Sequence, residues 1–154
     1  MSEIGPKDAL ERFGISTTHH LMPNGETRFR LVDRDGAGYV RTEAGEAGAW
    51  QNSHLHRRMV ETYIVQAGWV AVAQLSQNNE LEITVLREGN VLSASPGVAH
   101  NVYMPAGAIT HVVKHGTNTA DDWVTSQATA LLDLLTKPLL EPDILRIAKS
   151  NDAR

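Results

Sequence analysis

NSHLHRRMVETYIVQAG, residues 52–68, places two histidines one residue apart, then a glutamate, and continues into a run of β-forming residues. Side chains of a strand alternate between its faces, so His54 and His56 point the same way if this segment is extended. Glu61 follows His56 at an odd spacing and needs a turn or bulge within residues 57–60 to face them. The stretch therefore predicts a cluster of candidate metal ligands carried by strands.

A further histidine, His100, opens the segment HNVYM after a Pro-Gly turn at residues 96–97. In a strand, His100, Val102 and Met104 share one face. Three neutral imidazoles and one carboxylate suit a borderline divalent metal such as Zn, Fe, Mn or Ni, and they leave coordination positions open for water or substrate. The candidate site thus draws on two separate segments.

Short segments of β-forming residues, separated by Gly, Pro or Asn turns, lie on both sides of the opening stretch. They cover residues 27–33, 37–43, 61–66, 69–76, 80–88, 90–94, 99–104 and 108–116. This regular spacing is typical of an all-β sandwich or barrel. We therefore expect an antiparallel β core over about residues 27–116.

Helical signals flank this core. Residues 6–13 begin with proline and precede Gly14, which predicts a short N-terminal helix. No repeat or linker divides the sequence, so we expect one domain, residues 1–154.

A helical tail is expected over about residues 121–150, where apolar residues recur at offsets of four, seven and eight. Asp121 or Asp122 suits the N-cap of its first helix, and Pro142 suits the start of one further turn.

The composition argues against several kinds of protein. Lys and Arg total 14 against 18 Asp and Glu, and no basic cluster exceeds the pair Arg57-Arg58, so no nucleic-acid partner is expected. The absence of cysteine excludes disulfides and thiolate sites and fits a reducing cytoplasm. No apolar run reaches the length of a membrane span, and the polar N-terminus does not resemble a signal peptide. We expect a cytoplasmic protein without a membrane partner.

The first stretch resembles the first motif of the cupin family, G-x5-H-x-H-x3-4-E-x6-G. Gly48, His54, His56, Glu61 and Gly68 occupy every fixed position with the required gaps.

The second cupin motif, G-x5-P-x-G-x2-H-x3-N, is matched in part. Gly89, Gly97 and His100 stand in register, whereas Ser95 replaces the proline and Met104 replaces the asparagine.

Similarity to the cupin superfamily implies an RmlC-like jelly roll, which is an antiparallel β-barrel with its metal inside. The resemblance assigns one divalent transition metal (Fe, Mn, Zn or Ni) to His54, His56, Glu61 and His100. Met104 would make the pocket wall more apolar than asparagine does. Cupins also commonly form homodimers, which is the assembly we expect.

The resemblance implies a metal-dependent enzyme that acts on a small polar organic substrate, with oxygenase or isomerase chemistry. Tyr63 or His111 would then be the catalytic acid or base. Two alternatives stay open: a sugar or sugar-nucleotide isomerase or epimerase that uses the same two side chains, and a non-catalytic protein that binds a small ligand. The fold alone does not select among them.

Other candidate residues have two interpretations each. His111 and Lys114 are three apart on one expected strand, so only one of them can face the cavity. Trp50 could line the pocket mouth or pack in the core. Arg28 and Arg30 share a strand face and could bind an anionic substrate, although a solvated edge is the favoured interpretation.

Overall fold

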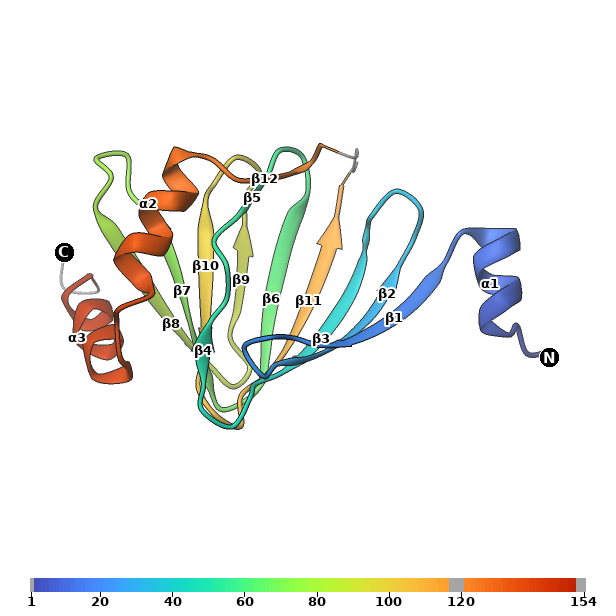
Figure 1. Cartoon of the computed structure of the whole chain (residues 1–154), viewed down its shortest axis with the longest axis horizontal. Coiled ribbons are helices and arrows are strands. Elements are labelled where there is room, and N and C mark those ends of the chain that lie inside the picture. Colours follow the sequence, from blue (N-terminus) through green and yellow to red (C-terminus); the bar gives the residue numbers. More distant parts are fainter. Residues whose placement is uncertain (1, 117–120, 152–154) are drawn as a thin grey trace.

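Antiparallel strands between residues 16 and 115 form two sheets that face each other (Figure 1). The computed structural model describes residues 2–116 and 121–151. The strands are β1 (Ser16–Leu21), β2 (Thr27–Val32), β3 (Gly38–Glu43), β4 (Ala49–Trp50), β5 (Leu55–His56), β6 (Val60–Ala67), β7 (Trp69–Leu75), β8 (Leu81–Arg87), β9 (Val91–Ala94), β10 (His100–Met104), β11 (Ile109–His115) and β12 (Trp123–Val124). The helices are α1 (Pro6–Phe13), α2 (Gln127–Thr136) and α3 (Glu141–Asn151).

The larger sheet has the strand order β1-β2-β3-β11-β6-β9, and the smaller sheet has the order β4-β10-β7-β8. Strand β11 lies between β3 and β6, so the chain crosses between the sheets rather than forming a simple meander. Strand β12 pairs with β5 at one end of the molecule. This antiparallel arrangement confirms the all-β jelly-roll fold with flanking helices that the sequence predicts.

Strand β7 explains how the two apolar cores are divided. Val70 and Val72 belong to the core between the sheets, whereas Ala71 and Ala73 belong to a second core on the outer face of the smaller sheet. Both faces of the strand are therefore covered, and its sequence WVAVA is apolar without alternation.

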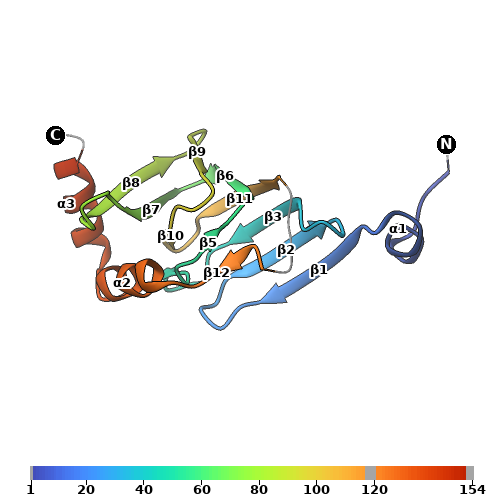
Figure 2. The same cartoon turned by 90° about the horizontal axis from the view of Figure 1, so that it is seen from above.

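Helices α2 and α3 lie against the smaller sheet, as Figure 2 shows from above. Leu132 and Ile144, both fully buried, pack against Ala71 and Ala73, whose small side chains allow the helices to approach. Helix α1 lies at the opposite end of the molecule beside β1 and has no buried residue.

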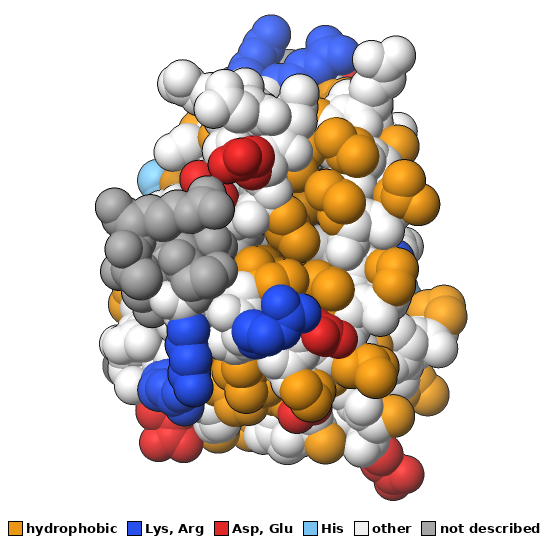
Figure 3. Space-filling model, turned by 90° about the vertical axis from the view of Figure 1, so that its left-hand side faces the viewer, with side chains coloured by type: hydrophobic (Ala, Val, Ile, Leu, Met, Phe, Trp, Pro, Cys, Tyr) orange, Lys and Arg blue, Asp and Glu red, His pale blue; other side chains and the backbone are white. Residues whose placement is uncertain are grey.

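The side of the molecule that carries α2 and α3 shows hydrophobic side chains at the surface, interspersed with charged ones (Figure 3). Leu134 and Leu140 are the most exposed large hydrophobic residues of this helical region. None of the described helices is long and apolar enough to cross a membrane.

The structure differs from the sequence prediction at both ends of the β core. The sheet begins at Ser16 rather than near residue 27, because STTHHL forms edge strand β1. His19 and His20 lie on this strand and are exposed. Its residues after Ser16 are exposed on both strand faces, so they carry no apolar alternation that would have predicted a strand.

The start of the helical tail is also corrected. Helix α2 begins at Gln127 with Ser126 as its N-cap, and Ser126 and Thr129 form a capping box. Asp121 and Asp122 precede β12 instead of capping a helix. The last segment forms an eleven-residue helix, α3, rather than a single further turn.

Candidate metal centre

Backbone pairing brings the two histidine segments together. The amide of His54 donates to the carbonyl of His100 at 3.1 Å, and the amide of His100 donates to the carbonyl of His54 at 3.0 Å. The amide of Gly97 donates to the carbonyl of His56 at 2.7 Å. Gly97 has a φ of +80°, which residues with a Cβ rarely adopt. This backbone conformation explains why glycine occupies this position of the turn.

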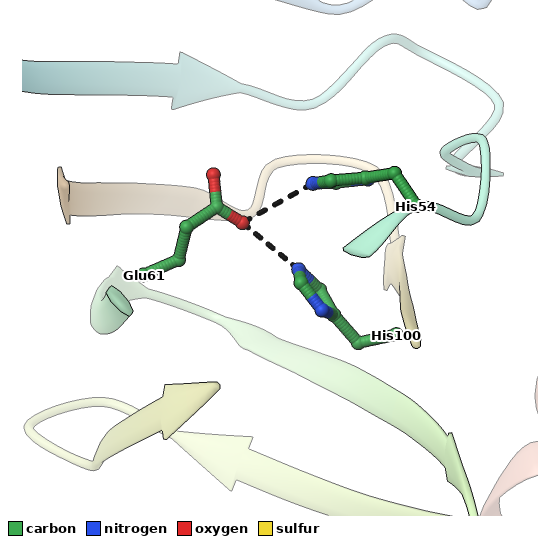
Figure 4. Close-up of side chains that lie close together, drawn as sticks. All are labelled: His54, Glu61 and His100. Atoms are coloured by element: carbon green, nitrogen blue, oxygen red, sulfur yellow. Dashed lines mark hydrogen bonds and ion pairs between the residues drawn. The ribbon is translucent and has the colours of Figure 1, made fainter. Parts of the chain in front are cut away.

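The three imidazoles converge on Glu61, which β6 contributes. Figure 4 shows one carboxylate oxygen of Glu61, Oε2, joined to both His54 and His100. The distances from Oε2 are 2.8 Å to Nε2 of His100 and 3.2 Å to Nε2 of His54. Nε2 of His56 lies 3.3 Å from the other oxygen, Oε1.

Each imidazole is held from behind through its other nitrogen. Nδ1 of His54 lies 3.1 Å from the carbonyl of Asn52, and Nδ1 of His100 lies 3.0 Å from the carbonyl of Val98. Nδ1 of His56 lies 2.6 Å from Oδ2 of Asp122. All three Nε2 atoms are thereby aimed at the same point, as in metal sites whose outer partners orient the ligands.

This arrangement fits a bound cation. A neutral imidazole has one N–H donor and one acceptor nitrogen, yet His54 and His100 each face an oxygen acceptor at both nitrogens. The buried Nε2 of His56 has no hydrogen-bond partner among the described residues. A metal ion would accept all three Nε2 lone pairs while each Nδ1–H keeps its oxygen partner. The ligand atoms of His54, Glu61 and His100 already lie within 4.8 Å of one another.

The electrostatics favour the ionisation states that metal ligands need. Burial by itself raises the pKa of Glu61, but contacts with the imidazoles of His100, His54 and His56 and the charge of Lys114 hold that pKa well below its usual range. Burial lowers the pKa of His54, which favours its neutral form. Burial also acts to lower the pKa of His56, but Glu61 and Asp122 outweigh it and raise that pKa.

Tyr63 and Lys114 both contact the central carboxylate. The hydroxyl of Tyr63 donates to Oε2 of Glu61 at 2.7 Å, and the ammonium of Lys114 pairs with Oε1. Tyr63 is only 3% exposed, and burial together with the charge of Glu61 raises the pKa of its phenol. The phenol therefore stays protonated near neutral pH and acts as a hydrogen-bond donor.

The centre opens into a cavity of about 450 Å³. The lining side chains include His54, Glu61, Tyr63, Lys114 and Trp50. Trp50 both lines this cavity and packs on Tyr103, with ring centroids 5.4 Å apart, so both interpretations of its position hold. Met104 lies in the core between the sheets and is absent from the cavity wall.

His111 lies apart from the other predicted site residues. Thr110, Val112 and Lys114 face the interior from β11, so His111 points to the outer face. There its ring nitrogens lie 2.6 Å from the hydroxyl of Tyr39 and 2.6 Å from the amide oxygen of Gln66. The structure thus brings Lys114, rather than His111, to the cavity.

Asp122 is a site residue that the sequence did not reveal. Besides its contact with His56, its Oδ1 accepts the backbone amides of Arg58 and Met59 at 2.8 and 3.3 Å. Asp122 therefore holds the turn between the histidine pair and Glu61. Its only sequence signal was a pair of aspartates, which is also typical of a helix N-cap.

Asp133 of α2 anchors the segment just before His54. Its Oδ1 accepts from the backbone amide and the hydroxyl of Ser53 at 3.0 and 2.8 Å, and from the side-chain amide of Asn101 at 3.2 Å. The helix thereby fixes both histidine-bearing segments from the outside.

Known proteins match this chain in structure but not in sequence. No protein-family model matches it, and no curated protein does. The structure of oxalate decarboxylase from Bacillus subtilis at pH 4.6 matches with a TM-score of 0.58 and 16% identity, over 71% of this chain and 30% of that one. The formate complex of oxalate decarboxylase from Lactobacillus farciminis matches with a TM-score of 0.55 and 15% identity, over 68% of this chain and 32% of that one.

Oxalate decarboxylases are cupins, and these similarities fit the jelly-roll fold of this chain. This chain has a cupin fold. It spans about a third of the length of the decarboxylases that it resembles. The cupin fold is not tied to one role, since Drosophila melanogaster CENP-C, solved bound to CAL1, also matches, with a TM-score of 0.52 and 13% identity over 64% of this chain and 76% of that one.

Proposed function

We propose that this protein is a metal-dependent cupin enzyme that acts on a small polar organic substrate. The observation that supports it is the convergence of three Nε2 atoms on an ionised carboxylate at the end of a cavity. One divalent transition metal, Fe, Mn, Zn or Ni, would be held by His54, His56, Glu61 and His100. Manganese has direct precedent in the fold, since the Bacillus subtilis oxalate decarboxylase contains Mn(II) centres.

The bound ion would supply Lewis-acid polarisation of substrate oxygen atoms. Side chains of the protein would position the carboxylate, supply positive charge and form the cavity walls. Tyr63 keeps the Glu61 carboxylate in place by hydrogen bonding, and Lys114 brings a positive charge to the same end of the cavity. Trp50 and Trp123 supply apolar walls. We propose oxygenase or isomerase chemistry because those classes are frequent among cupins.

We also propose a cellular location, a domain organisation and an oligomeric state. A chain without cysteine fits the reducing cytoplasm. We further propose that residues 1–154 form one domain and that two chains associate as a homodimer, in which the exposed edge strand β1 would be covered.

Metal analysis of the purified protein tests the proposal. After reconstitution with each of the four metals in turn and removal of free ions, mass spectrometry should find about one ion per chain for at least one metal. His56→Ala and Glu61→Gln should reduce this content, whereas His111→Ala, which removes a histidine from the outer face, should not. A content below about a tenth of an equivalent with every metal would reject the metalloenzyme.

A further inference from the structure

The cavity beside the metal centre carries an excess of positive charge. Among the described residues that line it, the cationic ones are Arg28, Arg30, Lys114 and Lys137, whereas Glu61 is the one carboxylate. A cavity of this size is typical of small-molecule sites, in which a few charged groups orient the ligand. The charge excess is therefore a feature of the binding surface itself.

Two of the four cations already have carboxylate partners. Arg28 donates to Oε2 of Glu26 through Nε at 2.9 Å and through Nη2 at 2.6 Å, and Glu26 is 1% exposed. Lys114 pairs with Glu61. These contacts compensate the charges of Arg28 and Lys114.

The other two cations contact groups other than carboxylates. Nη1 of Arg30 lies 2.6 Å from Nδ1 of His20, and Nη2 lies 4.0 Å from the sulfur of Met22. Lys137 donates to the backbone carbonyl of Gln51 and, at 3.0 Å, to the side-chain oxygen of Asn52. No ion pair joins either cation to a carboxylate in residues 2–116 and 121–149.

Holding Arg30 in this position has an electrostatic cost. Burial, and then the neighbouring charge of Arg28, lower the pKa of Arg30, and the charge of Glu26 offsets them only in part. An anion in the cavity would relieve both effects, because it would restore a charge-assisted hydrogen-bond partner to the guanidinium.

The fold places Arg30 across the cavity from the metal centre. Arg30 lies on β2, and Glu61 lies on β6, which is the third strand beyond it in the order β2-β3-β11-β6. Ordinary strand spacing separates the two strand backbones by about 14 Å, a gap that the long arginine side chain partly spans. A ligand several atoms long could thus contact both ends.

We propose, on the basis of the proposed function, that the substrate is a small organic anion whose carboxylate or phosphate group binds Arg30, with Lys137 adding positive charge. The polar end that reacts would lie at the metal centre, and the charged end would fix its orientation. The planar guanidinium of Arg30 offers paired N–H donors, and this geometry matches both a carboxylate and a phosphate.

Direct binding measurements test this anion site without an assay of turnover. Trp50 and Trp123 line the cavity, and Trp123 stacks on His54 with ring centroids 5.8 Å apart, so tryptophan fluorescence can report on occupancy. The probes are succinate and inorganic phosphate, with succinamide as the uncharged counterpart of succinate. Titrations are made at low and at high salt on metal-loaded and on chelator-treated protein.

We expect succinate, phosphate or both to bind and to weaken as salt rises, and succinamide to bind much more weakly. Arg30→Gln should weaken anion binding about tenfold or more, and Lys137→Gln should weaken it less, whereas Arg87→Gln on β8, outside the cavity, should match the wild type. Arg30→Lys keeps the charge and should retain part of the affinity. Circular dichroism and metal content of each variant exclude misfolding as the cause.

Equal affinity of Arg30→Gln and wild type, or equal affinity for succinate and succinamide, would overturn the anion site. The result is separable from the test of the proposed function. A chain that binds no metal but binds succinate through Arg30 rejects the metalloenzyme and keeps the anion site, and a metal-loaded chain that is indifferent to anions does the reverse.

Discussion

Asp122 contacts the ring nitrogen of His56 that points away from Glu61. Its carboxylate lies 2.6 Å from Nδ1, which favours a proton on Nδ1 and would leave Nε2 as the lone-pair donor to a metal. The equivalent partners of His54 and His100 are backbone carbonyls, which mutation of a side chain cannot remove. The Asp122–His56 pair is therefore the outer contact of the centre that mutation can probe.

Replacing Asp122 by asparagine should weaken metal binding by about 10- to 100-fold, because the amide is a poorer acceptor and no longer selects the tautomer of His56. The measurement is a competition titration of the purified variant against a chelator of known affinity. Asp121→Asn is the matched control, since Asp121 is the neighbouring aspartate, is exposed and pairs with Arg57. Unchanged affinity in Asp122→Asn would show that His56 does not depend on this contact.

At the scale of elements, α3 is joined to the smaller sheet by a polar contact as well as by apolar packing. The hydroxyl of Tyr103, on β10, donates to Oε1 of Glu141 at 2.9 Å. Burial, followed by this hydrogen bond and the charge of Glu141, raises the pKa of Tyr103 to about 12. The same strand begins with His100, so the helical tail supports a strand that carries a candidate ligand.

The raised pKa of Tyr103 gives a pH-dependent stability. Because the folded state holds this proton more tightly than the unfolded chain, the contribution is complete below a pH of about 10 and is lost as pH rises toward 12. Tyr103→Phe should lower the free energy of unfolding by roughly 1 kcal/mol at pH 8, and the difference from wild type should shrink at pH 11 and above.

Urea denaturation of the wild type and of Tyr103→Phe at several pH values measures the difference in their free energies of unfolding. Other titrating groups are the same in both proteins, so their contributions cancel in this difference. Glu141→Gln serves as the control, because it keeps a hydrogen-bond acceptor but removes the negative charge. A gap between wild type and Tyr103→Phe that is the same at pH 8 and at pH 11.5 would contradict the assignment.

At the scale of the whole molecule, the candidate ligands connect the two sheets. His100 belongs to β10 of the smaller sheet, His54 pairs with it, and Glu61 belongs to β6 of the larger sheet. A bound ion would link the sheets at the end where the cavity opens, so metal binding should stabilise the fold as a whole.

Chelation should therefore lower the Tm. An ion present at about 100 times its dissociation constant stabilises a protein by about 2.7 kcal/mol, which for this chain length corresponds to roughly 5–10 °C. Differential scanning fluorimetry with and without EDTA measures the change. His100→Ala should show no EDTA effect and His111→Ala the full effect; an equal response of these two variants would mean that the ion acts elsewhere.

Much of the fold could be predicted from the sequence because the core strands alternate or are bounded by turn residues. Helix α1 was predicted with its observed bounds, and β2, β3, β7, β8, β9, β10 and β11 lie within the predicted segments. Strand β6 extends one residue beyond its predicted segment at each end, and the two-residue strand β4 was not predicted. Strand β1 was missed because an edge strand exposed on both faces has no apolar pattern. Strand β12 was missed because it has only two residues, too few to show a pattern, and it is defined only by their pairing with β5.

The candidate ligands were predicted from spacing, since local alternation places His54 and His56 on one face and the cupin resemblance adds Glu61 and His100. Their outer partners could not be predicted in the same way. Asp122 reaches His56 from 66 positions further along the chain, and its local pattern equally suited a helix cap. The catalytic roles suggested for Tyr63 and His111 stay predictions, with only Tyr63 lying in the cavity.

The sequence by itself determined an antiparallel β core, because periodicity and turn residues act over a few positions. The jelly roll and the set of candidate ligands were expected from the resemblance to cupins. Tertiary structure alone decided that Lys114 faces inward and His111 outward, that Asp122 contacts the candidate ligand His56, and that Arg28 and Arg30 line a cavity rather than a solvated edge. Those facts depend on which strands become neighbours and on which face closes against the other sheet, and both follow from packing of the whole chain.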